Sequence, residues 1–294
     1  MAEALPANAA ERPLRCGRFV FRPCRPLVMG VLNVTPDSFS DGGRYAGFDA
    51  ALAQAQALIE EGADLLDIGG ESTRPGAREV SVEEELRRVL PLVQALARGN
   101  LAVSVDTRKP EVMRAAIEAG AAMINDVFAL RAEGALEALA ASDAAICLMH
   151  MQGEPDTMQR SPQYHEVAAE VRDFLHQRAA TCVAAGVAKE RIVLDPGFGF
   201  GKTLEHNLAL LQNLGDLGRG EFAVLAGLSR KSMLGSITGR PVAERLAASL
   251  AAALAATAKG AAILRVHDVA ATVDALKVWR AAQGLAIWPQ VASG

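Results

Sequence analysis

The sequence lacks the features that mark secreted and membrane-spanning proteins. Its four cysteines never form a C-x-x-C pair, and a chain of 294 residues that is 51% hydrophobic can bury a core without disulfides. The first residues, MAEALPANAAER, contain no basic stretch followed by an apolar one, so no secretory signal is indicated. The most hydrophobic late stretch, 246–266, is mostly alanine and is interrupted by Ser249, Thr257 and Lys259, which argues against a membrane span. We therefore expect a cytoplasmic protein with reduced thiols.

Basic clusters, aromatic residues and metal-binding motifs are also scarce. With a formal net charge of −4 and no block of Lys and Arg, the chain has no electrostatic preference for nucleic acid or an anionic membrane. Aromatic residues make up 4%, too few for a sugar-binding groove, which disfavours a glycosidase built on paired carboxylates. The sequence contains no H-E-x-x-H motif, Cys/His cluster or EF-hand loop, so we expect no metal cage made by protein alone. Small-molecule substrates are the expected partners.

From Leu27 onward, short apolar runs alternate regularly with longer, alanine-rich amphipathic segments. The predicted strands are Leu27–Leu32, Asp64–Ile68, Leu101–Val105, Ala122–Asn125, Ala144–Met149, Arg191–Leu194, Phe222–Leu228 and Ala262–Val266. The predicted helices are Phe48–Glu61, Val82–Arg98, Glu111–Ala119, Tyr164–Ala185, Leu204–Leu214, Val242–Lys259 and Val269–Gln283. This βαβα order, without a linker, predicts an α/β fold with a single (β/α)8 TIM barrel. We assign the barrel to 27–283, a leader with a short hairpin around 17–21 to 1–26, and a C-terminal tail to 284–294.

A polar residue stands at the C-terminal end of every predicted strand. These residues are Asn33, Asp67, Asp106, Asn125, His150, Asp195, Ser229 and His267. In a barrel these positions converge on one mouth, where active sites are built. Helix capping alone explains about half of them, because Asn, Asp and Ser are common caps, but it does not explain two histidines. The carboxylate and amide groups of Asp106, Asn125 and Asp195 suit a planar heterocycle rich in N–H and C=O groups.

The segment GFGFGKT, residues 197–203, lies between a predicted strand and a predicted helix. A Walker A phosphate loop requires glycine where this chain has Pro196, so the spacing does not fit that motif. We interpret the segment as a tight loop that brings its backbone and the rings of Phe198 and Phe200 close to a flat ligand, with Asp195 at its base.

Cationic side chains follow the last two predicted strands. Arg265 and His267 flank one residue, so strand geometry points both the same way and makes them a candidate anion clamp. Lys231 beside Arg230 has three interpretations: a solvated surface pair, a Schiff-base nucleophile, or a hydrogen-bond donor to a ring carbonyl or ring nitrogen.

Two loops rich in Gly, Ser and Pro, 33–43 and 69–77, follow the first two strands and are expected to carry substrate.

Several separated motifs between Leu27 and Trp279 stand out: MGVLNVTPDSFSDGG, DIGGESTRPGA, SVDTRKPEV, INDV, LMHMQG, LDPGFGFGKTLEHN, GLSRKSMLG and LRVHDV. The resemblance that they carry is to the dihydropteroate synthase family of pterin-binding folate enzymes. It implies a Mg²⁺-dependent transferase that condenses p-aminobenzoate with 7,8-dihydropterin-6-ylmethyl diphosphate to give 7,8-dihydropteroate and pyrophosphate by an SN1-like path. It also implies a homodimer, for which the helix expected over 242–259 is a candidate interface.

Residue roles follow from the resemblance, motif by motif. The pterin is expected to bind Asp106, Asn125, Met149, Asp195, Gly227 and Lys231. The diphosphate is expected to bind Asn33, through Mg²⁺, and Arg74, Arg265 and His267. The p-aminobenzoate site is expected to include Phe39, Thr73, Pro75, Phe200, Lys231 and Ser232. The catalytic residues are expected to be Asp106, Asp195, Lys231 and Asp37, and the three aspartates among them would stabilise a pterin cation.

Three other functions remain open at this point. One is another pterin-binding barrel, such as a methyltetrahydrofolate-using methyltransferase domain, which should lack the DSFSDGG and STRPGA loops. The second is a non-catalytic regulator that binds pterin, and the intact Arg74, Lys231, Arg265 and His267 argue against it. The third is a Schiff-base aldolase, which borohydride trapping at Lys231 would reveal.

Overall fold

The apolar runs form the strands of a closed parallel barrel. The computed structural model describes residues 13–34, 44–71, 79–153, 158, 162–289 and 291–293. The barrel strands are β3 (Leu27–Asn33), β4 (Leu65–Gly69), β5 (Ala102–Asp106), β6 (Met123–Asp126), β7 (Ala145–Met149), β8 (Ile192–Asp195), β9 (Ala223–Ala226) and β10 (Ile263–Val266). They pair in chain order, and β10 closes on β3 with Ile263 opposite Leu27. The prediction of one (β/α)8 barrel is confirmed.

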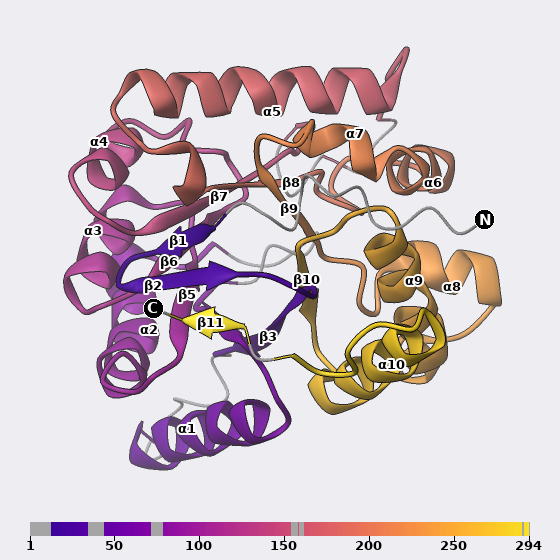
Figure 1. Cartoon of the computed structure of the whole chain (residues 1–294). Coiled ribbons are helices and arrows are strands. Elements are labelled where there is room, and N and C mark those ends of the chain that lie inside the picture. Colours follow the sequence, from indigo (N-terminus) through magenta and orange to yellow (C-terminus); the bar gives the residue numbers. More distant parts are fainter. Residues whose placement is uncertain are drawn as a thin grey trace.

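Helices surround the barrel (Figure 1). They are α1 (Arg44–Glu60), α2 (Val82–Leu96), α3 (Pro110–Glu118), α4 (Ala135–Ala140), α5 (Val167–Ala184), α6 (Leu204–Gln212), α7 (Leu214–Gly218), α8 (Ser232–Thr238), α9 (Leu246–Ala258) and α10 (Val269–Ala282). The single helix expected over 242–259 was wrong, because a short 3-10 turn over 242–244 precedes α9. Arg245 stands at this division and donates to the carbonyls of Arg230 and Arg240, a tertiary contact that periodicity does not report. Among the described residues, no helix is long and apolar enough to cross a membrane.

The barrel wall divides the hydrophobic core into two parts. Successive strand residues face opposite sides, so Leu66 and Ile124 pack outward against the helices, while Leu65, Met123 and Leu225 fill the interior. As predicted, none of the four cysteines, Cys16, Cys24, Cys147 and Cys182, forms a disulfide. The apolar interior filling makes this barrel a packed core and leaves only its ends for a site.

A small antiparallel sheet lies across one end of the barrel (Figure 1). It contains β1 (Leu14–Cys16), β2 (Phe19–Arg22) and β11 (Ala292–Ser293), and Gly17, at φ +56°, makes the turn between the first two. Leu14 and Phe21 join the interior cluster, and the Gly17 N–H donates to the carbonyl of Asp143, just before β7 begins. The sheet therefore covers the end where the strands start. The segment limits 1–26, 27–283 and 284–294 stay predictions.

Candidate active site

Polar side chains from four strands meet inside the end of the barrel where the strands finish. The Arg265 guanidinium donates from Nε to Oδ2 of Asp67 at 2.6 Å and from Nη2 to Oδ2 of Asp106 at 3.0 Å. Asn125 donates from Nδ2 to the same Oδ2 of Asp67 at 3.1 Å. The structure thus brings together three of the predicted site residues, and it adds Asp67 as the residue that joins two of them.

The charges in this cluster strongly influence one another. Burial raises the pKa of Asp106 to about 7; Arg265 acts to lower that pKa, while Asp67, Glu85 and Asp126 raise it further. Burial alone would lower the pKa of Arg265, but Asp67 and Asp106 outweigh it and raise that pKa well above its usual value. Arg265 is therefore a permanent cation, and Asp106 is a carboxyl group that can exchange a proton near neutral pH.

Asp195 ends β8 and lies at the base of the glycine loop, as predicted. The Gly197 N–H donates to its Oδ1 at 2.7 Å. Burial raises the pKa of Asp195, although the Gly197 hydrogen bond and the charges of Lys231, Arg265 and Lys202 act to lower it. A buried carboxylate surrounded by cations and one N–H donor is suited to hold a polar ring edge that offers hydrogen-bond donors.

The glycine loop lies flush against the end of β7. A Cβ at Gly197 would lie 2.0 Å from the carbonyl oxygen of His150, so only glycine allows this approach. The buried Lys202 ammonium donates to the carbonyls of Phe200 at 2.9 Å and His150 at 3.2 Å, and lies 3.0 Å from His150 Nδ1. Burial lowers the pKa of Lys202 to about 7 and that of His150 to about 3, so His150 is neutral and accepts at Nδ1. Lys202 is thus the donor that fixes the loop to its neighbouring strand.

The two phenylalanines of this loop have different environments. Phe198 is 1% exposed and belongs to the core between barrel and helices, so the prediction that its ring approaches a ligand was wrong. Gly199, at φ +81°, lies between the two rings, and Phe200 packs against a separate cluster that includes Met149 at the barrel mouth. Lys231 places Nζ 4.3 Å from the centre of the Phe200 ring.

Lys231 and its exposed neighbour Arg230 have different partners. Arg230 has a left-handed backbone, at φ +59°, and its guanidinium binds both carboxylate oxygens of Asp268. Lys231 instead lies over Phe200 in the mouth. Its charge also acts to lower the pKa of Asp195, so the ammonium lies near that carboxylate, and the roles expected for Lys231 stay predictions.

The remaining described site residues line the same mouth. His267 Nδ1 lies 3.0 Å from Ser229 Oγ, which fixes the orientation of the imidazole. Met149 is buried, and a Cβ at Gly227 would make only an ordinary contact, 4.0 Å from that of Arg265. Ser232 is exposed at the first position of α8.

Asn33 is exposed at the end of β3, and its Oδ1 would be 3.4 Å from a Cβ on Gly69 of the neighbouring strand. The other residues predicted for the site lie outside the described residues. They are Asp37, Phe39, Thr73, Arg74 and Pro75.

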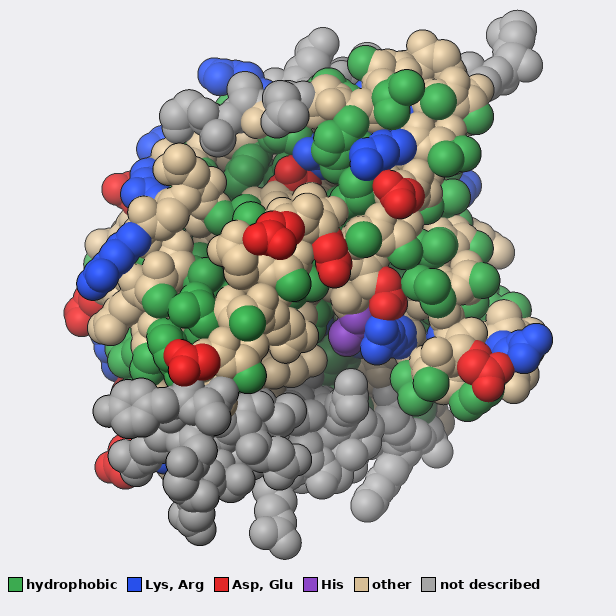
Figure 2. Space-filling view, turned by 90° about the horizontal axis from the view of Figure 1, so that it is seen from below, with side chains coloured by type: hydrophobic (Ala, Val, Ile, Leu, Met, Phe, Trp, Pro, Cys, Tyr) green, Lys and Arg blue, Asp and Glu red, His purple; other side chains and the backbone are tan. Residues whose placement is uncertain are grey.

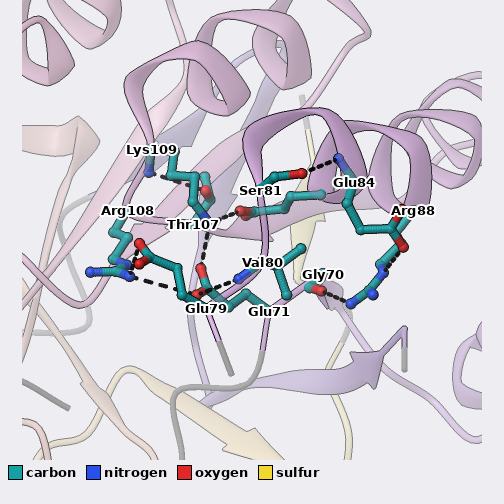
Figure 3. Close-up of polar contacts among 11 residues, drawn as sticks. Gly70, Glu71, Glu79, Val80, Ser81, Glu84, Arg88, Thr107, Arg108 and Lys109 are labelled. Atoms are coloured by element: carbon teal, nitrogen blue, oxygen red, sulfur yellow. Dashed lines mark hydrogen bonds and ion pairs between the residues drawn. The ribbon is translucent and has the colours of Figure 1, made fainter. Parts of the chain in front are cut away.

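An ion-pair cluster ties the ends of β4 and β5 together (Figure 3). Lys109 Nζ lies 2.5 Å from Glu71 Oε2 and 2.6 Å from Oε2 of the fully buried Glu85. Arg108 Nη2 lies 2.7 Å from Glu79 Oε1 and 3.6 Å from Glu71 Oε1. Arg108 and Lys109 come two and three residues after Asp106, so the cluster anchors the chain just beyond that carboxylate.

Sequence reasoning noted Asp67 only as one polar residue at a strand end and assigned no role to Lys202 or to Glu71 and Lys109. A charged residue inside an apolar strand, such as Asp67 in LLDIG, is the signal that marks a buried functional carboxylate. No comparable local signal marks Lys202, because its partner outside the loop, His150, lies 52 residues away in the sequence.

Comparison with known proteins agrees with this arrangement. The family model described as pterin binding enzyme matches residues 29–267. The chain is 52% identical over 257 residues to a dihydropteroate synthase of Haemophilus influenzae, covering 87% of this chain and 94% of that protein. It is 53% identical over 279 residues to that of Neisseria meningitidis, covering 92% and 98%. This chain belongs to the dihydropteroate synthase family.

Solved dihydropteroate synthases share its fold. The Burkholderia cenocepacia enzyme complexed with 7,8-dihydropteroate is 54% identical, with a TM-score of 0.86 over 93% of this chain and 97% of that one. The Xanthomonas albilineans enzyme with 4-aminobenzoic acid is also 54% identical, with a TM-score of 0.86 over 94% and 100%. The Yersinia pestis enzyme with a sulfonamide drug complex is 49% identical, with a TM-score of 0.87 over 92% and 99%. The activity that the resemblance implied, a transferase reaction yielding 7,8-dihydropteroate, is confirmed at the level of the family.

Proposed function

We propose that this chain makes 7,8-dihydropteroate from p-aminobenzoate and 7,8-dihydropterin-6-ylmethyl diphosphate, releasing pyrophosphate. The observation that carries the proposal is the desolvated cluster of Asp67, Asp106, Asn125 and Arg265 next to Asp195, in a chain similar to enzymes that bind 7,8-dihydropteroate and 4-aminobenzoic acid. The cluster offers hydrogen-bond acceptors for a ring rich in N–H groups and a cation for the diphosphate.

The pterin would bind among the carboxylate and amide groups. Asn125 Oδ1 is buried and has no partner among the described residues, so a ring N–H would satisfy it. Asp106 and Asp195 would accept from other ring N–H groups, and Lys231 would donate to a ring carbonyl or nitrogen. Met149 and Gly227 would line the ring slot.

The diphosphate would bind near Arg265 and His267, with Arg74 and Asn33. The donor set at the end of β3 fits a magnesium ion that arrives with the diphosphate. Asn33 supplies one hard oxygen, and the described residues contain no cluster of three His, Cys, Asp or Glu that could hold a metal, so phosphate and water would supply most ligands. Bound Mg²⁺ would neutralise charge on the leaving diphosphate.

The chemistry would follow an SN1-like path. The bond between the pterin methylene carbon and the diphosphate oxygen breaks first, and its electron pair leaves with the diphosphate. Arg265 and His267 stabilise that negative charge, while Asp106, Asp195 and Asp37 stabilise the pterin cation. The amine of p-aminobenzoate is neutral and forms the C–N bond with its own lone pair, so no strong base is needed. The cationic nitrogen that results then releases its proton to water. Phe39, Thr73, Pro75, Phe200, Lys231 and Ser232 would line the p-aminobenzoate site.

A homodimer is the expected assembly. Helices α8, α9 and α10 lie side by side on one flank (Figure 1). Large apolar side chains are exposed there: Ile237 at 55%, Val242 at 55%, Leu246 at 44% and Val278 at 70%. Such a patch favours a protein interface over solvent. Sedimentation should give the mass of a dimer, and a monomer at micromolar concentration would contradict the assignment.

A nucleic-acid partner gains no support from the charge distribution on the surface. On the face that Figure 2 shows, acidic and basic side chains are interspersed among apolar ones. Such mixing creates no extended region of positive potential that would attract a polyanion. We propose a cytoplasmic enzyme that acts on small substrates.

The test is turnover of the purified protein. With Mg²⁺, the dihydropterin diphosphate and p-aminobenzoate, we expect dihydropteroate and pyrophosphate in equal amounts, and a sulfonamide should raise the apparent KM for p-aminobenzoate. Asp195→Asn provides the matched control, since it removes one carboxylate and should slow turnover in a folded protein. Pterin binding without either product would favour a regulator instead.

A further inference from the structure

Asp67 holds the centre of the cluster without belonging to the predicted set of ligand contacts. It lies on β4 and is fully buried. Its partners come from strands on both sides, because Asn125 lies on β6 and Arg265 lies on β10, each two strands away around the barrel. One carboxylate oxygen, Oδ2, accepts both hydrogen bonds.

We propose that Asp67 is a positioning residue that couples the pterin subsite to the diphosphate subsite. This inference rests on the proposed function, which places Asn125 against the pterin ring and Arg265 against the diphosphate. The Asn125 amide and the Arg265 guanidinium would bind opposite ends of the same substrate. Because one oxygen of Asp67 accepts hydrogen bonds from both, it fixes the distance between them. The methylene carbon that reacts lies between those ends, so this distance determines where the reacting bond lies.

The hydrogen bonds constrain each partner specifically. Asp67 accepts a hydrogen bond from Nε–H of Arg265, and Asp106 accepts one from Nη2–H. These two of the five guanidinium donors fix its plane, and the others can donate to an anion. Asn125 donates a hydrogen bond from Nδ2 to Asp67. The Oδ1 of Asn125 therefore faces away from that carboxylate and remains a buried acceptor. Without Asp67, Arg265 keeps only the Asp106 bond and the Asn125 amide can rotate.

A carboxylate is costly to bury at this position. Asp67 Oδ1 is buried and has no partner among the described residues, and an unpaired buried acceptor costs free energy. Leu65, two residues earlier on the same strand, belongs to the apolar filling of the barrel interior, so Asp67 is a charged residue at the edge of an apolar interior. By contrast, Asp64, just before β4 starts, forms a two-pronged ion pair with Arg25 at 2.7 Å and 2.7 Å, far from the mouth, and offers a matched structural control.

The experiment compares Asp67→Asn and Asp67→Ala with Asp64→Asn. Calorimetry measures binding of two partial ligands: inorganic pyrophosphate with Mg²⁺, and a dihydropterin that carries a hydroxymethyl group instead of the diphosphate ester. The asparagine keeps a neutral acceptor in place of Oδ2, so both affinities should fall about 3- to 10-fold, and the alanine variant should lose more of both. Asp64→Asn should lower the melting temperature and leave both affinities within about 2-fold, since it breaks an ion pair outside the site.

A non-additivity test separates positioning from general loosening. If Asp67 acts through Asn125, Asp67→Asn should weaken pterin binding much less in an Asn125→Ala background than in the wild type. The inference is overturned if Asp67→Asn and Asp67→Ala, both folded by melting analysis, keep both affinities or lose only one. Turnover by the wild-type protein is measured beside these variants. If the wild type makes dihydropteroate, the proposed function holds even when this inference fails.

Discussion

Removal of the Arg265 guanidinium should lower the free energy of unfolding more than removal of an exposed arginine does. In that variant, additional removal of the Asp67 charge should recover part of the loss. Arg265→Leu leaves two buried carboxylates, Asp67 at 0% and Asp106 at 13% side-chain exposure, without their shared cation. Breaking a buried ion pair from one side costs about 3–5 kcal/mol. At about 2–4 °C per kcal/mol for a large domain, the melting temperature should fall by about 6–20 °C at pH 8.

The pH dependence gives this prediction its sharpest form. The pKa of Asp106 is raised to about 7, above its ordinary 3.8, so the folded state binds more protons than the unfolded state between these values. Stability from this group is therefore present at low pH and is lost as pH rises through 7. Without Arg265 that fall should steepen, so the variant should be nearer to wild type at pH 5 than at pH 8.

Calorimetric melting at pH 5 and pH 8 measures both effects. Adding Asp67→Asn to Arg265→Leu should raise the melting temperature at pH 8, since one uncompensated charge is removed. The reasoning is refuted if Arg265→Leu melts like the wild type at pH 8, or if the second substitution lowers stability further.

Three further predictions concern single side chains. Lys202→Met should raise the KM for p-aminobenzoate about 10-fold while kcat changes less, because the Phe200 carbonyl loses its buried donor; equal changes in both constants would contradict this. Asp64→Asn should lower the free energy of unfolding by about 3 kcal/mol through loss of the buried Arg25 pair and leave kcat/KM unchanged, as thermal melting and steady-state rates will show. Asp106→Asn should abolish most turnover and flatten the decline of melting temperature between pH 5 and pH 8; an unchanged decline would remove Asp106 as its cause.

The barrel could be predicted because its strands are short, apolar and bounded by glycines and polar residues. Local composition does not report the elements that tertiary contacts create. Helix α8 contains Gly235; a Cβ there would lie 2.2 Å from Nη2 of Arg245, so the guanidinium of a residue ten positions away lies against this glycine. Helix α4 is six residues long, too short to show a helical period.

The positions of the site residues could be predicted, but their pairings could not. Strand ends in a barrel converge, so Asp106, Asn125 and Asp195 were placed together by topology alone. The pattern around Arg265 predicted an anion clamp, yet it could not reveal that two carboxylates already hold the guanidinium. Such pairs depend on side chains 159 and 198 residues apart, and no local sequence pattern encodes that contact.

The most direct test of this account is a crystal structure of the protein soaked with dihydropterin-methyl diphosphate and Mg²⁺. The account predicts the pterin ring within hydrogen-bond distance of Asp106, Asn125, Asp195 and Lys231, with the diphosphate on Arg265 and His267. A pterin ring bound at any other place, or a diphosphate that does not contact Arg265, would contradict it.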